Sequence, residues 1–370
     1  MKIVISINTS WNIYNFRLDL IKSLQAQGYE IIALAPKDTY VAKLEALDIK
    51  CYHVKLNAKG TSPIRDLGLI FQYYKLFKII KPDIVLSYTI KPNIYGNFAL
   101  YLLGIPVINN ISGLGTLFIK TSFATSIAKF LYKFSLRSSS HVFFQNEQDQ
   151  KLFLKLNLIK FHKCSIIPGS GVDVEKFNCD RTENLGNKYL FVGRLISDKG
   201  VFEYLESAVS ILKHHPNKEF LLCGAIDSNN KTAISIKDLE YYTNNYSQIK
   251  YLGKTDAIIK LLSKIDVMVL PSYREGLSRS LVEAAAMSLP IITTNVPGCN
   301  DVVEHGLNGF LCEVKSQESL ENSILKMIKL SNDKRLQMGL NGRSIIINKF
   351  TYKIVNNIYL DMMNKILKIK

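Results

Sequence analysis

Two glutamates in the stretch REGLSRSLVEAAA have the chemistry and the spacing to hold a sugar-like ligand. Glu275 directly follows a predicted strand, and Gly276 beside it permits close approach of a ligand to the backbone. The amides of Leu277 and Ser278 are expected to begin a helix, whose N-terminus attracts anions. Glu283 lies two turns into that helix, and a carboxylate can accept two hydrogen bonds from a vicinal diol such as that of ribose. One nucleotide-sugar could therefore touch both glutamates, although a solvent-facing helix glutamate and a loop glutamate without a role are the plainer alternative.

A second group of charged residues follows another predicted strand, in GRLISDKG. Arg194 comes after Gly193 at the carboxyl end of the strand, and Lys199 lies near the start of the next predicted helix. Two cations at a helix N-terminus could hold a diphosphate and stabilise the charge that it gains on leaving. A solvated pair of charges on a loop is equally compatible with these residues alone.

Apolar strand-like runs alternate with amphipathic helical segments along the whole chain. Runs such as KIVISI, DIVLSY and VMVLPS are rich in Val, Ile and Leu, which is typical of parallel strands covered on both faces. The polar stretch DRTENLGNK separates two such series. We therefore predict two doubly wound α/β domains, with ligand-binding residues just after the strands and a cleft between the facing domains. The expected bounds are 1–178 and 179–350, followed by a helix over 351–370 that returns to the first domain.

The composition excludes several classes of protein. At 370 residues, with 47% hydrophobic and 21% charged residues, the chain is long enough for two ordinary globular domains. Its six cysteines are scattered and show no metal-ligand spacing, which indicates reduced thiols and no zinc site. The chain begins directly with a predicted strand and has no apolar run long enough to span a bilayer. We therefore expect neither a signal peptide nor a membrane-spanning helix.

Three longer motifs occur in order along the second half: IPGSGVDVEKF, GRLISDKG and VMVLPSYREGLSRSLVEAAAMSLPIITTNVPGCNDVVEHGLNGFL. In order and spacing they resemble the nucleotide-binding half of family 4 glycosyltransferases, which are retaining enzymes of the two-domain, Rossmann-like GT-B fold. The resemblance is strong over about 165–312 and weaker before it. The segments YNFRLDLIKSL, KPNIYGNFA and NNISGLGTLF are similar to bacterial members that extend undecaprenyl-diphosphate-linked glycans, such as N-acetylgalactosaminyl transferases.

The resemblance implies a role for each residue of these motifs. Arg194 and Lys199 match the pair that holds the donor diphosphate, which implies neither a metal ion nor a cofactor. Glu275 matches the acidic residue at the transferred sugar, and Glu283 matches the residue that binds the ribose. The turn over 276–278 matches one whose amides meet sugar and phosphate. The implied reaction moves a sugar such as GalNAc from a UDP-sugar donor to a lipid-linked saccharide acceptor, in O-antigen, capsule or related glycan synthesis.

The resemblance also places the acceptor beside the first domain, where the residues that we expect near it are Ser10, Trp11, Asn12, Arg17, Lys91, Ser112 and Gly113. Trp11 is the only tryptophan and could either stack on a sugar or pack in the core. Many family members have His where this chain has Ser112, and a serine hydroxyl is no general base at neutral pH. A same-face mechanism needs no protein base, because the departing phosphate oxygen takes the proton of the acceptor.

Four alternatives are weaker. The acidic residues Asp173 and Glu175 are similar to a DxD metal motif, but they lie far in sequence from the other site residues, and we expect a structural role. A UDP-N-acetylglucosamine 2-epimerase on the same fold would need acid–base residues where this chain has Ile90 and Ser112. A dinucleotide oxidoreductase would need GxGxxG after the first strand, where the chain reads INTSWNIYNF. Nucleic-acid binding would fit the net charge of +16, but only nine of the 47 basic residues are arginine and no nucleic-acid motif is present.

The basic charge is concentrated in the first half, where residues 1–178 carry 22 basic and 11 acidic side chains. A Lys-rich chain can simply reflect an AT-rich genome, but an excess on one half also suits an anionic membrane surface. The segment FATSIAKFLYKFSLR places two stripes on a helix, an apolar one of Phe123, Ile127, Phe130 and Phe134 and a basic one of Lys129, Lys133 and Arg137. We expect the apolar stripe to pack on its own sheet and the basic side to face lipid headgroups. This arrangement implies a cytoplasmic protein held peripherally on the inner face of the bacterial plasma membrane.

Overall fold

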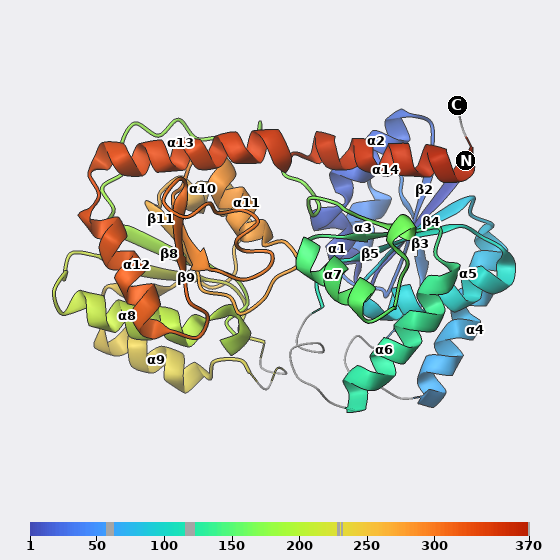
Figure 1. The fold of residues 1–370 in the computed structure, drawn as a ribbon, viewed down its shortest axis with the longest axis horizontal. Coiled ribbons are helices and arrows are strands. Elements are labelled where there is room, and N and C mark those ends of the chain that lie inside the picture. The colour runs from blue at the N-terminus through green and yellow to red at the C-terminus, as the bar shows by residue number, and fades with distance from the viewer. Residues whose placement is uncertain (57–62, 115–122, 228–229, 231, 369–370) are drawn as a thin grey trace. The chain divides into compact units, whose positions relative to one another are not determined.

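The chain folds into two compact units (Figure 1). The computed structural model describes residues 1–56, 63–114, 123–227, 230 and 232–368. Unit 1 comprises Met1–Ser170 with Tyr352–Lys370, and unit 2 comprises Gly171–Thr351. The chain thus passes into the second unit after Ser170, earlier than the expected position after residue 178.

Unit 1 contains a parallel sheet, which has seven strands in the described residues. Their order is β3-β2-β1-β4-β5-β6-β7, so the direction of winding reverses between β1 and β4. The strands are β1 (Lys2–Ser6), β2 (Glu30–Ala35), β3 (Lys50–His53), β4 (Ile84–Tyr88), β5 (Val107–Ile111), β6 (His141–Phe144) and β7 (Cys164–Ile166). In the central register, Ile3 pairs with Ile31 on one side and with Ile84 on the other.

Helices cover both faces of this sheet, which explains why its central strands are apolar throughout. One face packs against α4 (Pro63–Ile80), α5 (Asn97–Leu103), α6 (Phe123–Ser135) and α7 (Glu147–Lys155), with the short helices η1 (Pro92–Gly96) and η3 (Leu136–Ser138) between them. A further short helix, η4 (Phe161–Lys163), follows α7. The other face packs against α1 (Ser10–Phe16), α2 (Leu18–Ala26), α3 (Val41–Glu45) and α14 (Tyr352–Leu367). No helix in the described part of the chain combines the length and the apolar character needed to cross a bilayer.

Unit 2 repeats the same architecture with six strands in its described residues, in the order β10-β9-β8-β11-β12-β13. The strands are β8 (Lys188–Val192), β9 (Glu219–Cys223), β10 (Ile249–Tyr251), β11 (Val267–Leu270), β12 (Ile291–Thr294) and β13 (Gly309–Cys312). The helices are η5 (Ser197–Lys199), α8 (Val201–Leu212), α9 (Ile236–Asn245), α10 (Ile258–Leu262), α11 (Arg279–Ala286), α12 (Gln317–Lys329) and α13 (Asn332–Lys349). The predicted pair of doubly wound, Rossmann-like α/β folds is therefore confirmed.

The last helix, α14, belongs to unit 1 although it follows unit 2 in the sequence. It buries Val355, Tyr359 and Met363 in the core of the first sheet. The hydroxyl of Tyr88 on β4 donates to the hydroxyl of Tyr359 (3.0 Å), which in turn donates to the side-chain oxygen of Asn110. Apolar burial and this buried hydrogen-bonded chain together anchor α14 to the sheet.

Candidate active site

The strand order of unit 2 brings two loops together beyond the carboxyl ends of the two central strands. Strands β8 and β11 are neighbours, and the winding reverses between them. In an open parallel sheet, this reversal opens a crevice beyond the carboxyl ends of the strands, where ligands bind. The loop after β8 carries Arg194 and Lys199, and the loop after β11 carries Glu275.

Lys199 and Glu275 form an ion pair that is also a hydrogen bond, from Nζ to Oε1. The two side chains are only 20% and 12% exposed. A lysine and a carboxylate that are largely removed from water stabilise one another, because each would otherwise bear an unpaired desolvation cost. The structure therefore brings together two residues that lie 76 positions apart and that the sequence assigned to one ligand.

Backbone contacts hold the Lys199 turn against the loop after β11. The carbonyl of Asp198 accepts hydrogen bonds from the N–H of Tyr273 (2.9 Å) and from the hydroxyl of Ser272 (3.2 Å). Gly200 follows with φ +73°, and a β-carbon there would overlap the carbonyl oxygen of Pro271. The glycine of the DKG sequence is thus required both by the left-handed backbone and by the close approach of the two loops.

The Glu275 turn rests on a third loop, around Gly298. The N–H of Glu275 donates to the carbonyl of Pro297 (3.1 Å), and the N–H of Ser278 donates to the carbonyl of Gly298 (2.9 Å). Gly298 has φ +76°, and a β-carbon there would lie 2.6 Å from the β-carbon of Glu275. Because the amide of Ser278 is already engaged, it is not the open donor that the sequence suggested.

Arg194 lies apart from the Lys199–Glu275 pair in its contacts. Its guanidinium is 3.9 Å from Asp227, and its side chain is 56% exposed. Its backbone is fixed nearby, because Gly224 packs against the carbonyl of Gly193 with no room for a β-carbon. A half-exposed guanidinium on a fixed loop suits an anion that arrives from solvent.

Glu283 lies on α11 and pairs with Arg279, one turn earlier (2.6 Å). Its side chain is 13% exposed, so it is not the solvent-facing glutamate of the plainer alternative. A diol that binds this carboxylate would have to share it with the guanidinium of Arg279. One oxygen accepts from Arg279, and a carboxylate has further lone pairs for a diol.

Cys299, beside the site, and Asp173 of the DxD-like motif have structural roles. Burial, reinforced by the charge of Glu275, raises the pKa of Cys299 to about 12, so this thiol stays protonated and is no nucleophile. Asp173 accepts from the backbone N–H groups of Glu175 (3.0 Å) and Lys176 (3.1 Å), which closes a turn. Within the described ranges, no three His, Cys, Asp or Glu side chains gather closely enough to hold a metal ion.

The acceptor-side residues of unit 1 divide into exposed and structural ones. Trp11 is 43% exposed and packs edge-on against Phe16, so it is not a core residue. Asn12 donates its backbone N–H to the hydroxyl of Thr9 at the start of α1. Ser10 is buried and donates to the carbonyl of Pro36 (3.1 Å).

The remaining residues on that side differ in the same way. Lys91 is paired with Asp66 (2.9 Å) and is largely buried, which indicates a structural role. The guanidinium of Arg17 is buried over the ring of Tyr88, 4.1 Å from its centre. Ser112 is exposed, and Gly113 after it has φ +112°. The residues that follow, 115–118 of the NNISGLGTLF motif, lie outside the described ranges.

Two family models match the chain. The one described as "Glycosyl transferase 4-like" matches residues 2–146, and the one described as "Glycosyl transferases group 1" matches residues 178–345. Together they span most of both units. The chain is a glycosyltransferase of the family that these two models describe.

Relatives of this glycosyltransferase match over nearly its whole length. It is 28% identical to the N,N'-diacetylbacillosaminyl-diphospho-undecaprenol alpha-1,3-N-acetylgalactosaminyltransferase of Campylobacter jejuni, over 96% of each chain. It is also 28% identical to the capsular polysaccharide biosynthesis glycosyltransferase CapM of Staphylococcus aureus, over 90% of each chain. The identity is again 28% with the UDP-Gal:alpha-D-GlcNAc-diphosphoundecaprenol alpha-1,3-galactosyltransferase of Escherichia coli, over 85% of this chain and 84% of the other.

Solved structures confirm the fold. A glycosyltransferase from Rickettsia africae superposes with a TM-score of 0.81 at 20% identity, covering 100% of this chain and 99% of the other. Anabaena HepE in complex with UDP and glucose superposes with a TM-score of 0.82 at 18% identity, covering 98% and 99%.

Sequence reasoning missed several residues around the glycosyltransferase site. Gly298 and Asp227 were not singled out, because their importance arises from loops that meet only in the folded sheet. In unit 1, two side-chain atoms in the loops just after β1 and β4 are buried and find no hydrogen-bond partner among the described residues: Asn8 Oδ1 and Thr89 Oγ1. Thr89 also has φ +67°, a strained conformation for a β-branched residue. The only sequence signal for these was their place just after a strand.

Proposed function

We propose that this glycosyltransferase moves an N-acetylhexosamine such as GalNAc, or a related sugar, from a UDP-sugar to an undecaprenyl-diphosphate-linked saccharide, with retention of configuration and without a metal ion. Two relatives are named for an acceptor linked to undecaprenol diphosphate, and the name of one of the two relatives also gives a UDP-sugar as the donor. Both align over most of the chain. The staphylococcal relative supports a place in surface polysaccharide synthesis.

The observation that carries the proposal is the Lys199–Glu275 pair at the carboxyl edge of β8 and β11. In the proposed complex, Lys199 and Arg194 face the diphosphate of the donor, where they stabilise the charge that UDP gains as it leaves. Glu275 accepts hydrogen bonds from hydroxyls of the transferred sugar. Glu283 accepts from the ribose with the lone pairs that Arg279 leaves open.

The proposed transfer exchanges one bond for another on the same face of the sugar. The bond from the anomeric carbon to the β-phosphate oxygen breaks, and a bond from that carbon to the acceptor oxygen forms. The acceptor's proton passes to the departing phosphate oxygen, so Ser112 is not required as a base. The protein contributes position and charge, which the fixed loops around Gly200 and Gly298 supply.

The acceptor saccharide is proposed to bind unit 1 beyond the carboxyl ends of β1 and β4, the point at which that sheet also reverses. The strained Thr89 and the unsatisfied side-chain oxygen of Asn8 support this placement, because buried polar atoms without partners are typical of sites that a ligand completes. Trp11 offers an exposed ring on which a sugar can stack.

Peripheral attachment to an anionic membrane surface on the cytoplasmic side is part of the proposal. Large apolar side chains are exposed on the helical layer α4–η4: Leu67, Phe71, Ile79, Tyr101, Leu102, Ile127, Phe130, Phe134 and Phe161. The opposite layer, made by α1 to α3 and α14, exposes Trp11 and Leu47 among its described residues. Clustered exposure on one layer is typical of an interaction surface.

The test is thermal stability with UDP, GDP, ADP and a panel of UDP-sugars, followed by a transfer assay with the best donor. A ligand that binds only the folded state adds roughly 2.7 kcal/mol to the free energy of unfolding at a hundred times its Kd. We expect stabilisation by UDP species, weakened in Glu283→Ala and unchanged in the control Glu304→Ala, whose side chain is exposed. Stabilisation by GDP or ADP species alone would contradict the proposed donor, and no response to any nucleotide would contradict the whole proposal.

A further inference from the structure

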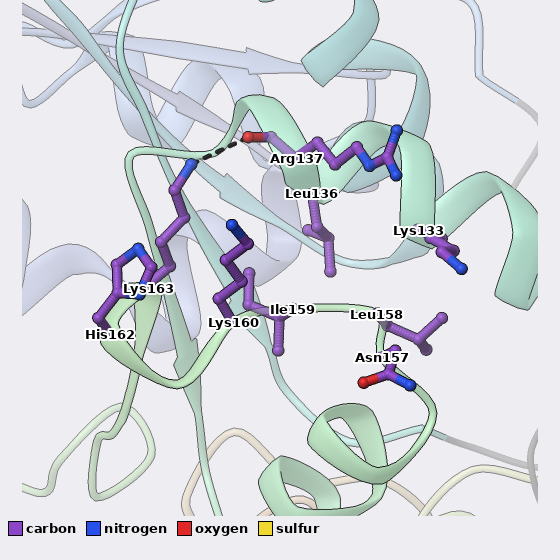
Figure 2. A pocket seen from close by; sticks show the side chains of 9 residues that line it. All are labelled: Lys133, Leu136, Arg137, Asn157, Leu158, Ile159, Lys160, His162 and Lys163. Atoms are coloured by element: carbon purple, nitrogen blue, oxygen red, sulfur yellow. Dashed lines mark hydrogen bonds between the residues drawn. The ribbon is translucent and has the colours of Figure 1, made fainter.

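A basic pocket lies in unit 1, far along the sheet from the loops after β1 and β4. It is a cavity of about 560 Å³ between two segments, the end of α6 with η3 and the loop over 157–163 that leads into β7. Figure 2 shows how the two segments converge on it. Five basic side chains line it: Lys133, Arg137, Lys160, His162 and Lys163.

The charge of this pocket is not neutralised. None of the residues that line it is acidic, and none of its lysines or its arginine forms an ion pair with a carboxylate in the described ranges. Lys163 donates instead to the carbonyls of Arg137 (2.9 Å) and Ser139 (3.1 Å), which fixes its ammonium group in place at the end of η3. An uncompensated group of cations in a hollow attracts an anion that carries several acceptor oxygens, such as a phosphate.

The floor of the pocket is apolar. Leu136, Leu158 and Ile159 line it and are at most 8% exposed. Its ligand should therefore combine an anionic group with an adjacent apolar group. A phosphodiester of glycerol has this composition, whereas a free inorganic phosphate does not use the apolar floor.

The surface beside the pocket is also apolar, contrary to the expectation from sequence. The stripe of α6 that was expected to pack on the sheet is exposed: Phe130 by 61%, Ile127 and Phe134 by 42% each. The side chain of Phe123 lies outside the described residues. Ala128 and Tyr132 are buried instead, and Tyr132 belongs to the core on this face of the sheet, so the apolar stripe faces outward.

This apolar stripe is continuous with the pocket. The rings of Phe130 and Phe134 are 4.6 Å apart, and the guanidinium of Arg137 lies 5.4 Å from the ring centre of Phe134. Phe161, between two of the basic residues, is 75% exposed. Phenyl rings next to cations are the side chains that enter the boundary between lipid headgroups and acyl chains.

We propose that this pocket binds the headgroup phosphate of an anionic phospholipid, while the α6 stripe inserts into the headgroup layer. The inference rests on the proposed membrane attachment and assigns it to a single site. A phosphopeptide or an RNA would match the cations but would leave the exposed phenyl rings in water, so charge and apolar surface together favour a lipid.

The experiment is cosedimentation of the purified full chain with vesicles of phosphatidylcholine, with or without phosphatidylglycerol. One variant carries Lys133→Ala and Lys160→Ala. Its matched control carries Lys22→Ala and Lys365→Ala, which remove the same charge from exposed sites on the opposite helical layer. Far-ultraviolet circular dichroism and the melting temperature establish that every variant is folded.

We expect the full chain to bind vesicles with phosphatidylglycerol and to bind pure phosphatidylcholine much more weakly. The pocket variant should lose roughly 30-fold in vesicle affinity, since two basic residues near a membrane contribute about 1 kcal/mol each. The control pair should lose clearly less. Phe130→Ser with Phe134→Ser should also weaken vesicle binding, although it removes no charge.

Equal losses in the pocket variant and the control pair would overturn the proposal, because they would show a diffuse field rather than a site. Equal binding to both kinds of vesicle would also overturn it. If glycerol phosphate or an RNA oligonucleotide occupies the pocket and the Phe130 and Phe134 changes leave vesicle binding unaltered, the ligand is not a membrane lipid. Stabilisation by UDP is measured on the same samples, so a failure of the pocket and a failure of the transferase proposal are distinguishable.

Discussion

The chain holds two groups of cationic side chains that differ in their burial and in whether a carboxylate neutralises them. In unit 2, Lys199 is mostly buried and is matched by Glu275. In unit 1, Lys133, Lys160 and Arg137 are exposed and have no such partner in the described ranges. A cation removed from water needs a counter-charge, whereas exposed cations are stabilised by water itself. The first group is therefore suited to recognise one ligand by exchange of hydrogen bonds, and the second to receive an anionic headgroup that supplies the missing counter-charge.

Removal of the Glu275 carboxylate should have the largest effect on the rate of transfer. Glu275→Gln keeps the shape of the side chain but leaves Lys199 without its counter-charge and replaces one charged hydrogen-bond-accepting oxygen, which the sugar hydroxyls would use, by an NH2 donor. We expect the initial rate of transfer to fall by about 100- to 1000-fold, the range for loss of one preorganised electrostatic contact. UDP should still raise the melting temperature. The control is Glu304→Gln, which removes an exposed carboxylate, and an equal loss of rate in that variant would refute the assignment.

Lys199→Met should come next, with a fall of roughly 100-fold in kcat/KM, because the leaving diphosphate loses one of its two cations. The variant Lys250→Met removes a lysine of another ion pair, one that is half exposed, and should be close to unchanged. If Lys199→Met lowers only the melting temperature and not the rate per folded molecule, the pair is a structural salt bridge.

Glu283→Gln should raise the Kd for UDP about tenfold, the loss that corresponds to one hydrogen bond to a charged group. The sharper measurement uses UDP that lacks its ribose 2′ and 3′ hydroxyls. This ligand should bind the unaltered protein about as weakly as UDP binds Glu283→Gln, and the variant should not distinguish the two ligands. Independent, additive losses would place the ribose elsewhere.

The smallest effect on chemistry should come from the basic pocket. Lys133→Ala with Lys160→Ala should leave transfer to a water-soluble acceptor unchanged within about twofold, as expected for distant, independent sites. Transfer to an acceptor embedded in anionic vesicles should slow and should become less sensitive to salt, because the screened interaction has been removed. A loss with the soluble acceptor would show that the two groups of cations are not separate.

Much of the fold could be predicted from the sequence, because the central strands of both units are buried on both faces and read as mostly apolar runs. The runs VMVL and IITT, for example, form β11 and β12 and are buried throughout. The loops after strands could also be identified, since parallel order places them at one edge. Arg194, Lys199 and Glu275 were found in this way.

The contacts within those loops could not be predicted. The fit of Gly298 against Glu275 and the approach of Asp227 to Arg194 depend on atoms brought together by sheet order. The direction of the α6 stripe was mispredicted, because periodicity shows that a helix has two faces but not which of them meets the sheet. Tyr132 is buried and Phe130 is exposed, although tyrosine is the more polar of the two.

The motif KPNIYGNFA shows a further limit. Its asparagines form a buried network: Asn97 donates to the side chains of Asn109 (2.9 Å) and Ser139 (3.0 Å), and Asn93 donates to the carbonyl of Asn110 (2.9 Å). These polar residues fasten η1 and α5 to β5. A distinctive polar motif can therefore serve packing as readily as ligand binding, and only the geometry separates the two.

Because α14 comes last in the sequence but packs in unit 1, it determines which unit can finish folding first. Unit 2 is one continuous stretch, Gly171–Thr351, and has all of its residues once position 351 has left the ribosome. Most of unit 1 is translated first, yet the part of one sheet face that α14 covers stays open until Val355, Tyr359 and Met363 have been synthesised. The domain that comes first in the gene thus finishes folding last. We expect a chain stopped after residue 351 to yield a protease-resistant unit 2 attached to a unit 1 that proteases digest.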